Sequence, residues 1–135
     1  MQTQIAPMLA VSHGAKAIDF YQKAFGARLL WQLGENADLV AGLSIGGADF
    51  YLAKDAPDFG TRSPEGAGFT TVRIEVFVDD PAGVHRRAIA AGAKHHSPVE
   101  EHEHQTHGER PIGRLLQGAV VDLFGHLWLI GKFLS

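Results

Sequence analysis

The pattern of apolar and polar positions predicts the same order of elements twice along the chain. In the first half it predicts a strand, a helix and three further strands, at residues 5–11, 14–25, 28–33, 39–45 and 49–53. Ile18, Tyr21 and Phe25 indicate the helix, because they recur at helical spacing. Phe20 lies off this stripe, so we expect it to be exposed, as at a subunit contact.

The order begins again after residues 55–68, which are rich in Pro, Gly and Asp and predict a loop. The second half predicts a strand, a helix and three strands, at residues 71–78, 81–91, 94–99, 114–122 and 126–133. Asp80 and Pro81 suit the start of the helix, and Gly92 suits its end. Residues 100–113 predict a long polar loop.

The two halves overlay as an internal duplication. Ala24-Phe25-Gly26-Ala27 corresponds to Ala90-Ala91-Gly92-Ala93 at an offset of 66 residues. We therefore predict one α+β domain over residues 1–135, with one repeat at about 5–54 and the other at about 70–133. Each βαβββ repeat has a sheet that is open on one face. Pairing the two sheets into a cup-shaped mixed sheet, with the helices outside, would bury more apolar area.

Composition and charge exclude several classes of function. The formal net charge is −3 and no basic stripe is present, which argues against a nucleic-acid partner. The chain has no cysteine, so disulfides and thiolate chemistry are excluded. Neither a secretion signal nor an apolar run long enough for a membrane span is evident, so we expect a cytoplasmic protein.

Four stretches carry a resemblance to a known family: 17–27 (AIDFYQKAFGA), 76–81 (VFVDDP), 87–93 (RAIAAGA) and 122–130 (DLFGHLWLI). With the duplicated order of elements, they resemble the vicinal-oxygen-chelate superfamily of glyoxalase I, bleomycin-resistance proteins and extradiol dioxygenases. The likeness is greatest to the PhnB-like branch and covers nearly the whole chain. It implies the cup-shaped glyoxalase/bleomycin-resistance fold and a homodimer.

Metal enzymes that this chain resembles hold a divalent cation with side chains from the first and last strand of each repeat. Counting from the motifs places those positions at Ala6, Tyr51, Arg73 and Leu129. None is a His, Asp or Glu, and Arg73 is a permanent cation. We therefore expect no metal at the usual site and no cofactor.

The alternation predicts which side chains line the cup. They are Met8, Ala10, Tyr51, Arg73, Glu75, Phe77, Leu127 and Leu129. This lining is apolar with one Arg and one Glu, which suits a small amphipathic ligand. Arg73 could bind a ligand carboxylate or phosphate. The alternatives are that Arg73 pairs with Glu75 and closes the cup, or that it makes a dimer contact.

Histidine is frequent, and five of the eight lie between His95 and His107. His102, His104 and His107 have a spacing that can bind zinc or nickel, so they are the candidates for an atypical metal site. The simpler interpretation is a solvated loop over the mouth of the cup. Close relatives resemble this chain in having a substrate-covering segment here, which makes Glu103, His104, His107 and Arg110 candidates for catalysis or binding. We interpret His126 as structural.

Three functions follow. The first is a small-molecule binding protein of the bleomycin-resistance type, which sequesters its ligand without chemistry. The alternative is a glyoxalase-like lyase, isomerase or related enzyme that uses His or Glu of the loop, or a metal at an unusual place. The third is a domain that acts only as a subunit. The sequence does not identify the ligand.

Overall fold

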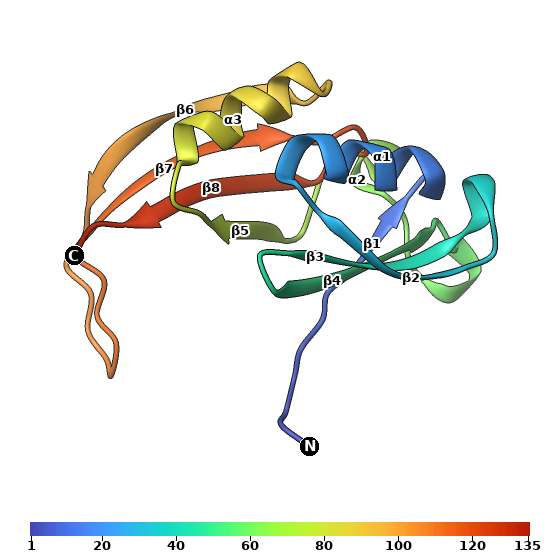
Figure 1. Ribbon diagram of the computed structural model, residues 1–135, viewed down its shortest axis with the longest axis horizontal. Coiled ribbons are helices and arrows are strands. Elements are labelled where there is room, and N and C mark those ends of the chain that lie inside the picture. The colour runs from blue at the N-terminus through green and yellow to red at the C-terminus, as the bar shows by residue number, and fades with distance from the viewer.

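The computed structural model describes residues 1–135 and contains the predicted order of elements twice (Figure 1). The first unit consists of β1 (Met8–Val11), α1 (Gly14–Phe25), β2 (Arg28–Leu33), β3 (Val40–Ile45) and β4 (Ala48–Lys54). The second unit consists of β5 (Arg73–Phe77), α3 (Pro81–Ala90), β6 (Lys94–Glu103), β7 (Arg114–Val121) and β8 (Leu127–Phe133). The short segment η1 (Asn36–Asp38) lies between β2 and β3, and η2 (Pro57–Phe59) and α2 (Pro64–Ala67) lie between the two units.

Each unit forms its own four-stranded mixed sheet. The orders are β1-β4-β3-β2 and β5-β8-β7-β6, so the first and last strand of each unit are parallel neighbours. The remaining pairs are antiparallel. No strand of one sheet pairs with a strand of the other. The α+β class with two βαβββ repeats is confirmed.

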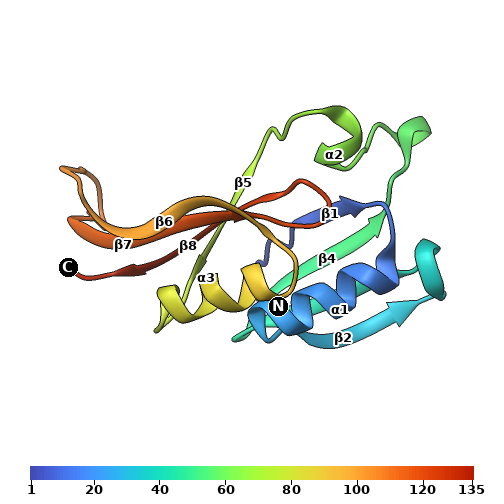
Figure 2. The same ribbon diagram turned by 90° about the horizontal axis from the view of Figure 1, so that it is seen from above.

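One hydrophobic core connects the two units. Tyr21 of α1 meets Phe50 of β4, and both Tyr21 and Phe25 meet Trp128 of β8, which belongs to the other unit. Phe20 packs against Tyr21 and Phe25. The ring centroids of Phe25 and Trp128 are 4.6 Å apart. The helices α1 and α3 also contact each other, on the same side of both sheets (Figures 1 and 2).

This packing corrects the prediction for Phe20. Its side chain is only 1% exposed, because α1 packs on both its own sheet and α3. A helix between two neighbours buries a wider stripe than a helix on one sheet. Phe20 therefore belongs to the core and is not available for a subunit contact.

The helices begin and end at residues that favour helix termini. Asp80 caps α3 by accepting a hydrogen bond from the Gly83 N–H at 3.1 Å, and Pro81 is the first residue of the helix, as predicted. Gly26 ends α1 in the left-handed conformation, with φ of 65°. The helix α3 ends at Ala90, with Ala91 as the cap before Gly92.

The predicted loops are shorter than expected. The strand β6 runs to Glu103, although the polar composition predicted that it would end at Val99. Pairing with β7 provides hydrogen bonds for the backbone of β6, and the polar side chains of β6 are mostly exposed. Residues 55–68 likewise contain η2 and α2 in place of a uniform loop. None of the helices has the length and apolar character that crossing a bilayer requires.

Candidate functional site

Each sheet has one face covered by helices and one face that is open. In the second unit, Ile74, Val76 and Trp128 pack in or against the core. Side chains of β5 and β8 alternate, so their neighbours Arg73, Glu75, Phe77, Leu127 and Leu129 lie on the open face. In the first unit, Met8, Ala10 and Tyr51 lie on the open face by the same alternation.

These predicted residues fall into two groups, one on each sheet. The cavity that contains Arg73 has a volume of about 200 Å³ and is lined only by β5, β6, β7 and β8. Met8 and Tyr51 do not line it. The structure therefore brings Arg73, Leu127 and Leu129 together in one cavity and leaves Met8 and Tyr51 on the other sheet.

Polar side chains surround Arg73 in this cavity. They are His96, Ser97, His102 and Gln117, while Leu127 and Leu129 form the apolar floor. We refer to this set as the Arg73 cavity. Neither His96, Ser97 nor Gln117 was predicted from the sequence. Gln117 carried a weak signal, as a polar residue within an apolar strand, but His96 and Ser97 lie beside irregularities in the β6–β7 pairing.

Arg73 and Glu75 do not pair with each other. Arg73 forms no ion pair or hydrogen bond within the chain, while the Glu75 carboxylate accepts a hydrogen bond from Gln117 Nε2 at 2.8 Å. Gln117 thus engages Glu75, the acidic residue that shares the open face of β5 with Arg73. The guanidinium of Arg73 keeps its five donors for other partners.

The histidines are divided between the cavity and the hairpin that follows it. His102 lies on β6, where its Nε2 is 3.3 Å from the Gln117 carbonyl oxygen and donates to it. The His102 and His104 rings are parallel, with centroids 6.4 Å apart. No group of three His, Asp or Glu side chains is close enough to hold a metal ion, so His107 does not complete a site with the other two.

The β6–β7 hairpin extends away from the body of the molecule (Figure 1). Its outer part carries Glu103, His104, His107 and Arg110, which are exposed and do not line the Arg73 cavity. The Thr106 hydroxyl donates to the Ile112 carbonyl oxygen at 2.8 Å and closes the outer part. The predicted covering segment therefore does not cover this cavity within a single chain.

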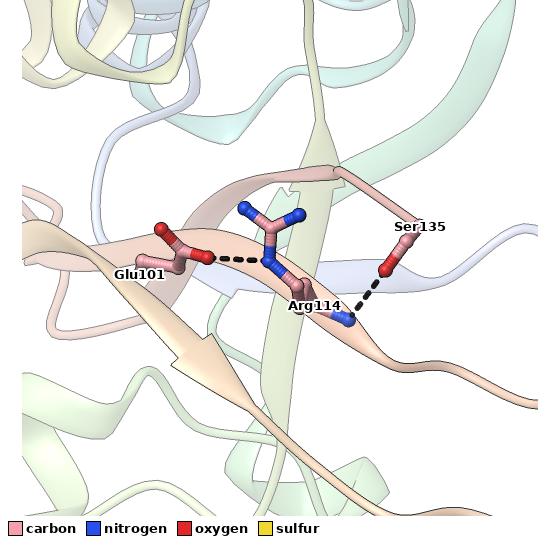
Figure 3. A network of polar contacts seen from close by, with 3 residues as sticks. All are labelled: Glu101, Arg114 and Ser135. Atoms are coloured by element: carbon pink, nitrogen blue, oxygen red, sulfur yellow. Dashed lines mark hydrogen bonds and ion pairs between the residues drawn. The ribbon is translucent and has the colours of Figure 1, made fainter.

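The chain end is tied to the base of this hairpin (Figure 3). The Arg114 backbone N–H donates to Ser135 Oγ at 3.2 Å, and Arg114 Nε donates to Glu101 Oε1 at 2.6 Å. Both side chains of the ion pair are about half exposed, so water screens it. These contacts fix where β6 and β7 begin to separate.

The open face of the first sheet is apolar by contrast. Trp31 lies over Gly42, where any larger residue would collide with the indole. Its ring centroid is 5.1 Å from that of Tyr51. Trp31 therefore forms part of the open face, together with Tyr51.

A buried carboxylate positions the strand that carries Leu127 and Leu129. Asp122 is 4% exposed and accepts hydrogen bonds from the Tyr21 hydroxyl at 2.6 Å and Trp128 Nε1 at 2.9 Å. Burial, together with the neighbouring Asp122 charge, raises the pKa of Tyr21 well above its usual value. Trp128 itself is 2% exposed and belongs to the core.

Comparison with known proteins identifies the family. A sequence model of the Glyoxalase/Bleomycin resistance protein/Dioxygenase superfamily matches residues 3–130. The chain belongs to this superfamily. It is 36% identical over 137 residues to an uncharacterised protein of Mycobacterium bovis, and the match covers 98% of this chain and 84% of that protein. An uncharacterised protein of Mycobacterium tuberculosis H37Rv has the same identity, with 75% of its length covered.

Solved structures of other proteins are similar to this chain. TioX from Micromonospora sp. ML1 is 27% identical, with a TM-score of 0.70 and coverage of 98% of this chain and 100% of that chain. The fosfomycin resistance protein FosX from Listeria monocytogenes is 18% identical, with a TM-score of 0.62 and coverage of 98% and 93%. At this identity FosX supports the fold alone.

Unsuitable side chains occupy the four positions at which the resemblance to metal enzymes predicts ligands. Ala6 and Leu129 have no donor atom, and Arg73 is cationic. Tyr51 offers a single phenol on the first sheet, among Met8 and Trp31. Zinc sites need three or four nitrogen, oxygen or sulfur ligands, so this set does not fit a divalent cation.

Proposed function

We propose that this superfamily member binds a small amphipathic anion on the open sheet faces, without a metal at the usual positions. The observation that carries the proposal is the unpaired guanidinium of Arg73 beside the apolar floor of Leu127 and Leu129. A planar fork of donors suits a carboxylate or phosphate, and the leucines suit a hydrocarbon body. The chain would then act as a cytoplasmic binding protein of the PhnB-like branch.

The exposed apolar side chains support pairing with a second copy of the chain. Met8, Trp31, Phe77 and Phe133 are between 41% and 53% exposed. The rings of Phe77 and Phe133 stack with centroids 4.2 Å apart, so they present one continuous surface. Burying apolar area of this kind favours association, and we propose a homodimer.

The binding test uses 3-phenylpropionate, an anion with an apolar body, followed by the shifts of amide resonances of Gln117 and Leu127. Replacing Arg73 by Ala should weaken binding by about 1.5 kcal/mol, or roughly tenfold in Kd, because an exposed charged hydrogen bond is at the low end of its range. Arg86→Ala, at an exposed position of α3 outside the cavity, is the matched control and should leave the Kd unchanged. Equal Kd values for the Arg73→Ala variant and the unchanged protein would refute the proposal.

An enzymatic role is the second candidate, and the observation favouring it is the imidazole of His102 within the Arg73 cavity. An imidazole beside a bound acid or carbonyl compound is suited to proton transfer near neutral pH. Metal analysis of untagged protein, before and after His102→Ala, tests whether an atypical metal takes part. Stoichiometric zinc, nickel or iron that the substitution abolishes would favour the enzyme and oppose the metal-independent proposal.

A further inference from the structure

A second cavity lies at the junction of the two units and is separate from the Arg73 cavity. Its volume is about 570 Å³. The walls come from β1, from residues 60–72 around α2, from the start of β5, and from His126 in the β7–β8 turn. None of its lining residues belongs to the Arg73 cavity.

His126 offers this junction cavity an acceptor atom. The residue is only 9% exposed, and its Nε2 is 2.7 Å from the Ala10 carbonyl oxygen. A carbonyl oxygen can only accept, so Nε2 carries the proton and Nδ1 of the neutral ring is an acceptor. Nδ1 has no partner within the chain. Because the chain has no fully buried side-chain nitrogen without a partner, Nδ1 is accessible to solvent, and the His126 ring lines the cavity.

Arg62 supplies a positive charge to the same cavity. Its aliphatic stem packs on Gly66 of α2, where a β-carbon would lie 3.2 Å from both Cγ and Cδ. The guanidinium forms no ion pair or hydrogen bond within the chain. Between Arg62 and His126 the wall is largely apolar, with Met8, Leu9 and Ile74 among its residues.

We propose that the junction cavity binds a small molecule of its own, in addition to the ligand of the Arg73 cavity. The ligand class has an apolar ring, an anionic group that Arg62 binds, and a hydroxyl or N–H that donates to His126 Nδ1. Such a ligand would contact β1 of one unit and β5 of the other, and so join the two units through one molecule. This inference does not depend on the function proposed for the Arg73 cavity.

The test compares 3-(4-hydroxyphenyl)propionate with 3-phenylpropionate, which lacks only the donor. Titration of the hydroxylated probe should shift the amide resonances of Ala10, Thr71 and Ile74. A long-range ¹H–¹⁵N spectrum of the intact protein should show His126 protonated at Nε2, with the Nδ1 resonance moving as the probe binds. Loss of the hydroxyl should weaken binding at this cavity about threefold to tenfold, as expected for one neutral hydrogen bond.

Two variants separate this cavity from the other. Arg62→Gln should weaken the hydroxylated probe at the junction about tenfold, since one charged hydrogen bond is lost. Arg73→Gln should leave that Kd unchanged. His126 itself is kept, because its replacement would also remove the bond to Ala10. The proposal is overturned by shifts confined to Gln117 and Leu127, by equal affinity for the two probes at the junction, or by no saturable binding at millimolar concentration.

Discussion

Asp122 is the buried polar centre of the fold, and replacing it tests the reasoning about packing most directly. Its two oxygens have separate partners. Oδ2 accepts from the Tyr21 hydroxyl and from Trp128 Nε1, while Oδ1 accepts from the backbone N–H groups of Phe124 and His126 at 2.8 and 3.0 Å. One oxygen therefore joins α1 to β8, and the other shapes the turn between β7 and β8.

The magnitude follows from the donors that each substitution leaves unsatisfied. Asp122→Ala removes the acceptor of four donors, of which the Tyr21 and Trp128 side chains are no more than 2% exposed. At the lower limit of about 1 kcal/mol for each donor, the free energy of unfolding should fall by about 4 kcal/mol. That is a large part of the free energy of unfolding of an ordinary domain, which is roughly 5–15 kcal/mol.

Asp122→Asn should remove only the hydrogen bonds that Oδ2 accepts. The amide oxygen can still accept from the two turn N–H groups, but the amide nitrogen then faces the Trp128 N–H and Tyr21. Since only the Oδ2 partners are lost, the unfolding free energy should fall by about 2 kcal/mol. Tyr21→Phe removes one donor and leaves the carboxylate with three, so its cost should be about 1–1.5 kcal/mol.

Urea denaturation followed by circular dichroism measures all three variants under one condition, with equal m-values as the check that unfolding remains two-state. We expect the order of stability to be the unchanged protein, then Tyr21→Phe, then Asp122→Asn, then Asp122→Ala. An Asp122→Asn variant as stable as the unchanged protein would refute the assignment of Oδ2 as the bond between α1 and β8.

The other predictions concern pH, turns and the open face. Burial and Asp122 raise the pKa of Tyr21, so the folded protein keeps the phenol proton to a higher pH than the unfolded chain. This contribution to the free energy of unfolding should be full below pH ~10 and should fall above it. Tyr21→Phe should reduce this fall, as measured by urea denaturation at alkaline pH. Gly125→Ala should be more destabilising in thermal melts than Gly46→Ala, because both have positive φ but only Gly125 has Glu65 N at 2.6 Å from an added β-carbon. Gly42→Ala should displace Trp31 and change its fluorescence emission with the fold retained, whereas an unchanged emission spectrum would contradict its position over Gly42.

Local patterns were sufficient for most of the fold. Apolar periodicity predicted α1 at residues 14–25 and β2 at residues 28–33 with the bounds that the structure has. The position of Phe20 could not be predicted in the same way, because a single helical stripe does not reveal that α1 packs on both a sheet and α3. Strand β6 was underestimated for a related reason: pairing with β7 holds a polar segment that composition alone assigns to a loop.

The candidate site was predicted where the strands are regular and missed where they are not. Strict alternation along β5 and β8 placed Arg73, Leu127 and Leu129 on the open face, as the structure has them. In β6 the register shifts between His95 and Ser97 and again between Ser97 and Glu100. Each bulge shifts the alternation of side chains between the two faces of the sheet. Counting every second residue along β6 therefore does not predict that His96, Ser97 and His102 line the cavity.

The two open faces differ in chemistry although the two units share one backbone plan. On the first sheet, Trp31, Tyr51 and Met8 are neighbours across three strands, and Gly42 is small because the indole lies on it. On the second sheet, Arg73 and the hydrogen-bonded pair of Glu75 and Gln117 occupy the corresponding side. The two units therefore share one scaffold, while the open face of the first sheet is apolar and that of the second combines polar groups with Leu127 and Leu129. An amphipathic ligand satisfies both surfaces only if they face each other across one site, which requires contact between two copies of the chain or between its own two sheets. The Arg73 cavity contains no residue of the first sheet, so the homodimer that we propose would bring the two faces together. This proposal predicts that binding strengthens with protein concentration in the range where dimers form.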